Sequence, residues 1–182
     1  TPGDAGGAGQ RARRMMSAPA AGLPYWRLSS FYFLYYAFLG AMMPYWSLYL
    51  QAAGLDAAAI GLVLAVMACT RIVAPNVWGW LADRSGRRLL VIRIGAFAAL
   101  ASFAGLLVRE DLWWLLAVVT LHSVFWNAIL AQYEVITLAS LGEQVQRYGQ
   151  VRLWGSVSFI LAVVGGGQLF DRVSVSRLPE LL

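Results

Sequence analysis

The sequence predicts an all-α, polytopic membrane helix bundle. Of its 182 residues, 60% are hydrophobic and 13% are charged, and this charged share is about half that of an ordinary soluble domain. A soluble chain of this length has too much surface for its volume to bury so much apolar area, so part of the chain must face lipid. Five apolar stretches are long enough to cross the hydrocarbon core, which takes about 20 residues.

The five expected spans cover residues 28–50, 57–81, 89–108, 113–141 and 151–170. The second span contains Arg71 and Pro75, and the fourth begins with Trp113 and Trp114, which are typical of a membrane interface. The fifth carries the run Gly165–Gly167, which favours close helix packing. Short connections favour antiparallel packing of consecutive spans.

Residues 1–27 are expected to form a disordered, cytoplasmic N-terminal arm, because they begin with a small, polar stretch rich in glycine and alanine. The arm does not resemble a secretory signal, since its small-residue run at 18–22 precedes the apolar stretch instead of following it. The membrane domain is therefore placed at residues 28–182.

The arginines predict the orientation. With a cytoplasmic N-terminus, the inside segments hold Arg11, Arg13, Arg14, Arg27, Arg84, Arg87, Arg88 and Arg147. The outside segments then hold only Arg109, Arg172 and Arg177, together with most of the acidic residues. The positive-inside rule therefore favours a multi-pass protein of the cell's inner (plasma) membrane with its N-terminus inside.

Several function classes are not expected. The arginines fall in clusters between apolar runs instead of forming one basic face, so no nucleic-acid partner is expected. One His and one Cys exclude a disulfide framework and a zinc site built from those ligands alone, and we expect no cofactor or metal. The spans also show no nucleophile–base set, so the chain is not expected to be an enzyme.

The connection between the second and third spans is rich in glycine and charge, and its key members are Gly79, Asp83, Arg84, Gly86, Arg87 and Arg88. Gly79 permits close helix packing, and Gly86 permits a tight turn with positive φ. Asp83 can pair with a neighbouring arginine or receive a cation from another helix. By charge alone this is an ordinary inside loop.

Glu134 and Arg152 are predicted to meet inside the bundle. They lie 18 residues apart on either side of the polar turn at 142–144. Residues equidistant from the turn of an antiparallel hairpin lie at the same depth, here about 8 Å above the turn. Ionisable groups within a membrane are costly, so such a pair is a candidate functional site.

The neighbours of this pair supply further polar and aromatic groups. Arg152, Ser156 and Phe159 share one helix face, and Asn127 shares the face of Glu134. A cation, a carboxylate, an amide, a hydroxyl and a ring together suit a polar or anionic organic solute with a flat face. The alternative is an interhelical salt bridge that only fixes packing.

Arg71 and His122 are the other ionisable groups of interest inside the spans. Arg71 is always charged, so it needs a carboxylate, backbone carbonyls or a water-filled cavity; it either attracts a substrate carboxylate or pairs structurally. His122 can titrate near neutral pH, but its position points away from the face of Asn127 and Glu134. It is either a packed, hydrogen-bonded residue or a proton relay.

The segment Gly79–Arg88 resembles the signature loop of the major facilitator superfamily, Gly-x-Leu-x-Asp-Arg-x-Gly-Arg-Arg/Lys. The segment Tyr148–Phe159 resembles the fifth-span entry of the lactose-permease-like and phenylpropionate-permease-like branches, and the likeness covers residues 25–171. The resemblance implies a twelve-span fold, of which the chain holds five complete spans of a truncated N-terminal six-helix half. It also implies that Asp83 and Arg84 belong to a gating latch.

The same resemblance implies residue roles. Glu134 and Arg152 match an acid and an arginine that bind solute in the sugar permease. Phe159 stands at the position of a ring-stacking tryptophan; it lacks the indole N–H, which argues against galactoside recognition.

The sequence therefore predicts a fragment of a secondary active transporter that takes up a small organic solute, such as an aromatic acid, sugar or nucleoside, with a proton by alternating access. The expected partners are the solute and proton, the lipid bilayer, and the missing C-terminal half of the same transporter. The alternatives are a proton-driven exporter of drugs or metabolites on the same fold and a non-transporting membrane assembly or sensor subunit.

Overall fold

The computed structural model describes residues 24–182, and every regular element in that range is helical. The helices are α2 (Tyr25–Met42), α3 (Trp46–Ala52), α4 (Ala57–Ser85), α5 (Arg88–Ala104), α6 (Leu112–Leu141), α7 (Tyr148–Phe170) and α8 (Leu178–Leu181). Short 3-10 segments follow α5, α6 and α7: η1 (Gly105–Leu107), η2 (Gly142–Arg147) and η3 (Val175–Arg177).

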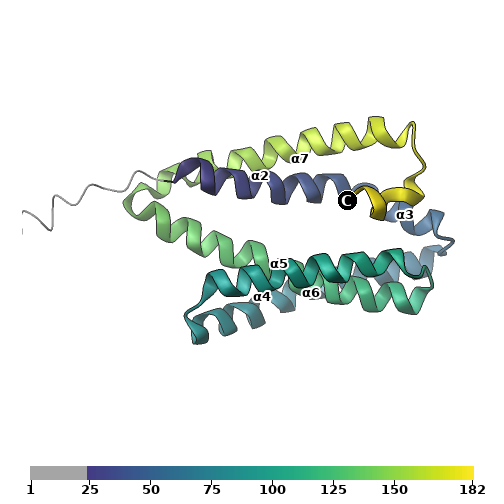
Figure 1. The fold of residues 1–182 in the computed structure, drawn as a ribbon, viewed down its shortest axis with the longest axis horizontal. Helices are drawn as coiled ribbons and strands as arrows, with labels where there is room; N and C mark the ends of the chain where they lie inside the picture. The colour runs from purple at the N-terminus through teal and green to yellow at the C-terminus, as the bar shows by residue number, and fades with distance from the viewer. Residues whose placement is uncertain (1–23) are drawn as a thin grey trace, which may run out of the picture.

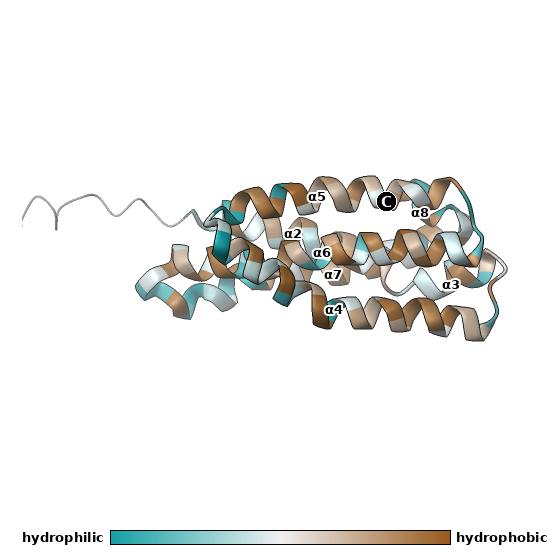
Figure 2. Ribbon diagram, turned by 90° about the horizontal axis from the view of Figure 1, so that it is seen from below, coloured by the Kyte–Doolittle hydropathy of each residue, from teal (hydrophilic) through white to brown (hydrophobic). Residues whose placement is uncertain are grey.

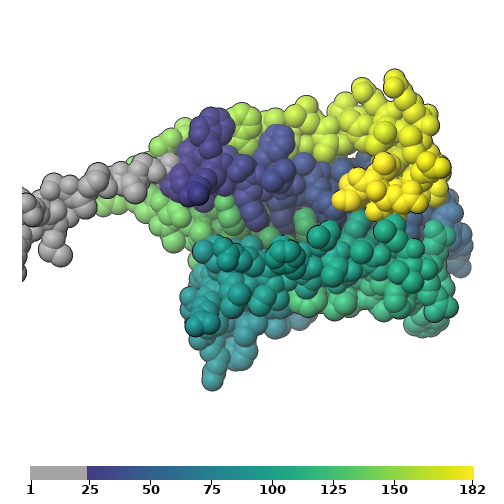
Figure 3. Space-filling view, in the orientation of Figure 1, coloured from purple at the N-terminus to yellow at the C-terminus, as the bar shows by residue number. Residues whose placement is uncertain are grey.

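The helices form two groups that lie side by side (Figure 1). In one group α2 packs along α7, and in the other α6 packs against both α4 and α5. The turn η2 joins α6 to α7 and so connects the groups at one end. At the other end the C-terminal segment lies across them, because η3 contacts α3 and α8 contacts η1 (Figure 3).

Acidic side chains fix where two of the long helices begin. Asp56 precedes α4 and accepts a hydrogen bond from the backbone N–H of Ala59 at 2.8 Å. Asp111 precedes α6 and accepts one from the N–H of Trp114 at 3.1 Å. Each carboxylate satisfies an otherwise unpaired donor in the first helical turn. Both caps lie at the same end of the bundle, because α4 and α6 start after connections on the same side.

The first expected span, residues 28–50, is not one continuous helix. It is divided at residues 43–45 into α2 and α3, at the point where Pro44 cannot donate a backbone hydrogen bond. The helix also starts earlier than expected. Residues 25–27 belong to α2 and not to the predicted disordered arm, while residues 1–23 of that arm lie outside the described residues.

Three segments of the described chain are long and apolar enough to cross a membrane: Ala57–Ser85, Arg88–Leu107 and Leu112–Phe170. The third contains both α6 and α7. Hydrophobic residues extend along the helices, while hydrophilic residues gather toward the ends of the bundle (Figure 2). Large apolar side chains such as Ile72 and Phe97 are exposed, as expected of a surface that faces lipid.

Glycines bring α2 and α7 into close contact. A Cβ atom added to Gly40 would lie 2.6 Å from the backbone carbonyl oxygen of Phe159, and one added to Gly166 would lie 2.7 Å from the ring of Tyr45. The Tyr45 hydroxyl donates a 2.5 Å hydrogen bond to the carbonyl of Val163 in the same helix as Gly166. The expectation of close packing at 165–167 is therefore confirmed at Gly166.

Candidate solute-binding site

A cavity of about 330 Å³ lies between α2, α4 and α6. Helix α2 contributes tyrosines, α4 contributes a cation, and α6 contributes most of the remaining polar groups. The lining residues that matter below are Tyr35, Tyr36, Arg71, His122, Trp126, Asn127 and Glu134. Three of the residues predicted from the sequence, Arg71, Asn127 and Glu134, thus share one cavity.

Glu134 and Arg152 meet across the turn between α6 and α7, as predicted. Their closest atoms, Oε1 and Nη2, are 4.0 Å apart, and the side chains are 33% and 47% exposed. The Tyr148 hydroxyl donates to the same Glu134 oxygen at 3.2 Å, while Arg152 donates to the Tyr36 hydroxyl at 3.1 Å. Because the pair is half-open and its members have other partners, the attraction between the two charges is weak, and both groups remain accessible to a solute.

None of the three predicted α7 residues, Arg152, Ser156 and Phe159, is among the residues that line the cavity, and Arg152 reaches its edge only through its contacts with Glu134 and Tyr36. Helix α7 packs along α2 and touches α6 only near the turn, so its residues beyond Arg152 face α2 or the exterior. Ser156 is exposed, and Phe159 is half-buried with its carbonyl oxygen against Gly40. A contact between these two side chains and solute stays a prediction.

Arg71 carries a charge without a partner in the described part of the chain. It lines the cavity, and no ion pair within 4.0 Å or hydrogen bond joins its guanidinium to residues 24–182. Of the two alternatives left by the sequence, a structural pair is not seen among these residues. Arg71 is exposed, so its guanidinium is free to contact an anion that enters the cavity.

Two aromatic rings form a wall of the cavity that the sequence analysis did not identify. Tyr35 and Trp126 stack with ring centroids 4.5 Å apart at 17°. Trp126, Leu130 and Glu134 lie at i, i+4 and i+8 on one face of α6, so helical spacing from Glu134 would have identified Trp126. Asn127, next to this wall, donates its amide N–H to the Ser123 carbonyl at 2.8 Å and keeps its side-chain oxygen as an acceptor.

His122 lines the same cavity, so the expectation that it points away from Asn127 and Glu134 is wrong. The reason is that the cavity takes in a broad arc of α6, because the residues of α6 that line it do not all lie on one narrow helix face. His122 is packed and hydrogen-bonded, since it is 6% exposed and its Nδ1 lies 3.0 Å from the carbonyl oxygen of Ala99, and this does not exclude the alternative of a proton relay.

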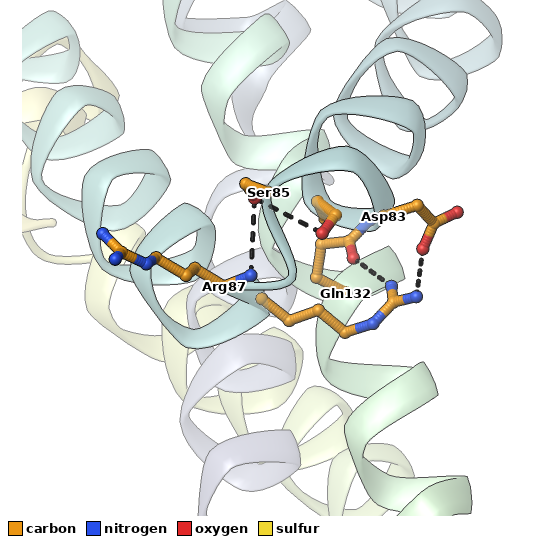
Figure 4. A network of polar contacts seen from close by, with 6 residues as sticks. Asp83, Ser85, Arg87 and Gln132 are labelled. Carbon is orange, nitrogen blue, oxygen red and sulfur yellow. Dashed lines mark hydrogen bonds and ion pairs between the residues drawn. The ribbon is translucent and has the colours of Figure 1, made fainter.

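Arg88 holds the loop between α4 and α5 to α6 by contacts with Asp83 and Gln132, both labelled in Figure 4. Arg88 pairs with Asp83 through one guanidinium nitrogen and donates with the other to Oε1 of Gln132 at 2.7 Å. Gln132 is 2% exposed and lies two residues from Glu134 on α6. Gln132 was not predicted from the sequence. An amide side chain within an otherwise apolar helix is the signal that would have identified it.

The remaining loop residues take simpler positions. Gly86 has φ of 63° and ends α4 with its N–H bonded to the Ala82 carbonyl, which confirms the expected positive φ. Arg84 lies over the Trp80 ring, with its guanidinium carbon 5.7 Å from the ring centroid, and the backbone N–H of Arg87 is 3.4 Å from the Ser85 hydroxyl.

The expectation for Gly79 is wrong. A Cβ there would lie 3.8 Å from Nε2 of Gln132, an ordinary contact, so the helices do not approach closely enough at this point to require glycine.

The lining of the cavity shows which interactions it can make. Among residues 24–182, no group of three or more His, Cys, Asp and Glu side chains is placed to hold a metal ion. What the cavity offers is a fixed cation, a carboxylate, an amide oxygen and a stacked pair of rings. Such a set can orient a small organic molecule through its polar end and its flat face.

Comparison with known proteins gives one family and two relatives. A family model described as the MFS_1 like family matches residues 25–182. A maltose permease of Geobacillus stearothermophilus is 34% identical over 79% of this chain and 37% of the relative's length. A probable 3-phenylpropionic acid transporter of Escherichia coli (strain K12) is 28% identical over 83% of this chain and 40% of its own length. The chain therefore spans about two fifths of these relatives. No solved structure gives a significant match.

Proposed function

The chain belongs to the MFS_1 like family of the major facilitator superfamily, and we propose that it is part of a secondary active transporter that takes up a small organic solute with a proton. The observation that carries this proposal is the cavity between α2, α4 and α6, where Arg71, Asn127 and Glu134 converge beside stacked rings. Transporters of this architecture bind solute near the membrane midplane between two repeated halves.

Within the proposed site each group has a role. Glu134 and Arg152 hold the polar part of the solute near the α6–α7 turn, with Tyr148 and Tyr36 fixing their side chains. Asn127 accepts a hydrogen bond from the solute, and the Tyr35–Trp126 wall contacts its flat face. Ser156 and Phe159 complete the site only when α7 turns toward the solute.

The proposed solute is an aromatic carboxylate. The unpaired guanidinium of Arg71 favours an anion, and the stacked rings favour an aromatic face. The named relatives are a maltose permease and a probable 3-phenylpropionic acid transporter, so a sugar is the solute class against which this choice must be tested.

The proposal extends to the whole protein and its setting. A C-terminal half of the same transporter closes the cavity from the side opposite α4 and α6, and alternating access arises from rocking of the two halves. The arginine distribution supports an inner-membrane protein with its N-terminus and the α4–α5 loop on the cytoplasmic side.

The α4–α5 loop is proposed to act as a gate. Arg88 ties it to Gln132, and Gln132 lies two residues from Glu134, so a change in the loop reaches the solute-binding part of α6 through one side chain. Asp83 and Arg84 face the cytoplasmic side, where they can contact the second half in one state and release it in the other.

Uptake by cells that express the complete gene product tests the site. With radiolabelled 3-phenylpropionate, the wild type is expected to accumulate solute, while Glu134→Gln and Arg152→Ala each lose at least about tenfold in initial rate, because each removes a charged contact worth about 1.5–3 kcal/mol. Glu143→Gln, an exposed acid in η2, is the matched control and keeps the wild-type rate. Unchanged uptake in both site variants would overturn the site, and accumulation of maltose alone would overturn the solute class.

A further inference from the structure

His122 presents an unused ring nitrogen within the bundle. Its Nδ1 lies 3.0 Å from the carbonyl oxygen of Ala99. A carbonyl oxygen only accepts, so Nδ1 carries the hydrogen and the neutral ring keeps its lone pair on Nε2. Nε2 is buried and has no hydrogen-bond partner among the described residues. A buried polar atom without a partner is uncommon in folded proteins, and a functional role is one explanation for it.

The free nitrogen is directed away from α5. The two nitrogens lie on well-separated edges of the imidazole ring, and the Nδ1 edge faces Ala99 on α5. His122 also lines the cavity between α2, α4 and α6, and its ring stacks at 22° on Trp126, a member of the aromatic wall. His122 thus belongs to the lining of the cavity, while its Nε2 atom is itself buried.

Few other charges face this ring. Helix α2 contributes the hydroxyls of Tyr35 and Tyr36 to the same cavity, α4 contributes Arg71, and α6 itself contributes Glu134. From α5 the neighbours of the ring are Ala99 and Phe103, which do not titrate. Glu134 already has Arg152 and Tyr148 as partners, so Arg71 is the cavity charge without a counter-ion among the described residues.

We infer that His122 is the residue that takes up the co-transported proton, and that it does so together with an organic anion held by Arg71. The proton adds to the Nε2 lone pair while the Nδ1 hydrogen stays with the Ala99 carbonyl, and the proton returns to water when the solute leaves. This inference rests on the proposed transport function and names its proton-binding residue.

Electrostatics link the two ligands. A proton on Nε2 without an anion would add a second positive charge to a cavity that Arg71 already lines, and burial of that charge is costly. A carboxylate in the cavity offsets both positive charges. By linkage, a protonated His122 strengthens binding of the anion as much as the anion strengthens binding of the proton.

Binding to the purified complete gene product tests this inference. Radiolabelled 3-phenylpropionate is the probe, between pH 6 and pH 9, where the carboxylate stays ionised because carboxyl groups titrate near pH 4. For each anion that binds, the wild-type protein is expected to take up as much as one proton from a weakly buffered solution. The dissociation constant rises by up to about tenfold per pH unit on the alkaline side.

The matched variant is His122→Asn. Its amide keeps an N–H near the position of Nδ1, so the bond to Ala99 can persist, but it has no titratable nitrogen. Proton uptake is expected to fall to near zero, and the dissociation constant to vary by less than about twofold over the same pH range. If His122→Asn keeps the wild-type proton uptake, another group such as Glu134 carries the proton and the inference is wrong.

The wild type alone also decides the question, should the variant fail to fold. Binding of 3-phenylpropionate with no linked proton and no pH dependence contradicts the inference but leaves the proposed solute-binding site in place. Binding of neither 3-phenylpropionate nor maltose contradicts the proposed function itself, and with it this inference.

Discussion

Gln132 shows how a single buried side chain can connect two parts of the molecule. It lies inside an apolar helix, 2% exposed, and it satisfies its amide by accepting from Arg88 of the α4–α5 loop. Arg88 in turn neutralises Asp83. The loop is thus attached to α6 by a hydrogen bond to a charged donor, the stronger class of hydrogen bond in proteins.

Replacing Gln132 by Leu is therefore expected to destabilise the protein by about 1–3 kcal/mol, because it leaves part of a half-buried guanidinium without an acceptor. The measurement is the thermal unfolding midpoint of the complete gene product in detergent. Gln168→Leu, at an exposed position of α7, is the control and should leave the midpoint nearly unchanged. Equal midpoints for the two variants would mean that the bond does not hold the loop.

At the same scale, the sequence predicted those contacts that follow from local geometry. The pairing of Glu134 with Arg152 could be predicted because the two residues lie on opposite sides of one turn. The positive φ of Gly86 could be predicted because a glycine in a charged turn after a long helix favours that conformation. The placement of His122 was missed, since it depends on how broad an arc of α6 the cavity takes in, which no spacing within one helix encodes.

At the scale of elements, the pairing of α2 with α7 joins segments far apart in the chain. It rests on small residues opposite bulky ones: Gly40 against the backbone at Phe159, and Gly155 against the Tyr36 ring. The sequence indicated five apolar segments and their glycines. It did not indicate which helices pair, because apolar faces on all of them look alike and the fit depends on surface shape.

Gly40→Ala tests this pairing. The added Cβ would lie 2.6 Å from a backbone oxygen that cannot move aside, so we expect a loss of about 1–3 kcal/mol in stability. Gly61→Ala is the control, because a Cβ on that α4 residue meets no atom within 4 Å and alanine is the better helix former. Thermal unfolding in detergent measures both. A Gly40→Ala protein as stable as Gly61→Ala would show that the helices are farther apart than described.

At the scale of the whole molecule, membership of the MFS_1 like family confirms the all-α membrane bundle of the major facilitator type that composition and the α4–α5 loop predicted. The coarse fold was predictable because lipid restricts a chain to few architectures and because the loop signature is long. The break between α2 and α3 was not predicted, although Pro44 marks it.

Orientation in the membrane can be tested by cysteine labelling in a Cys69→Ser background. A cysteine at Ser85 is expected to react with a membrane-impermeant maleimide only after the cells are opened, whereas one at Arg109 is expected to react in intact cells, because the positive-inside rule favours arginine-rich loops on the cytoplasmic side. The opposite labelling pattern would show that the N-terminus lies outside the cell.

The most direct test of the central claim is the movement of protons when solute is added. Right-side-out vesicles that contain the complete gene product, suspended in weak buffer without an imposed gradient, receive 3-phenylpropionate from outside. The account predicts that the medium becomes alkaline as proton and solute enter together, and that Glu134→Gln abolishes the signal. Acidification of the medium would identify an exporter that exchanges solute for protons, and no change would contradict proton-coupled transport altogether.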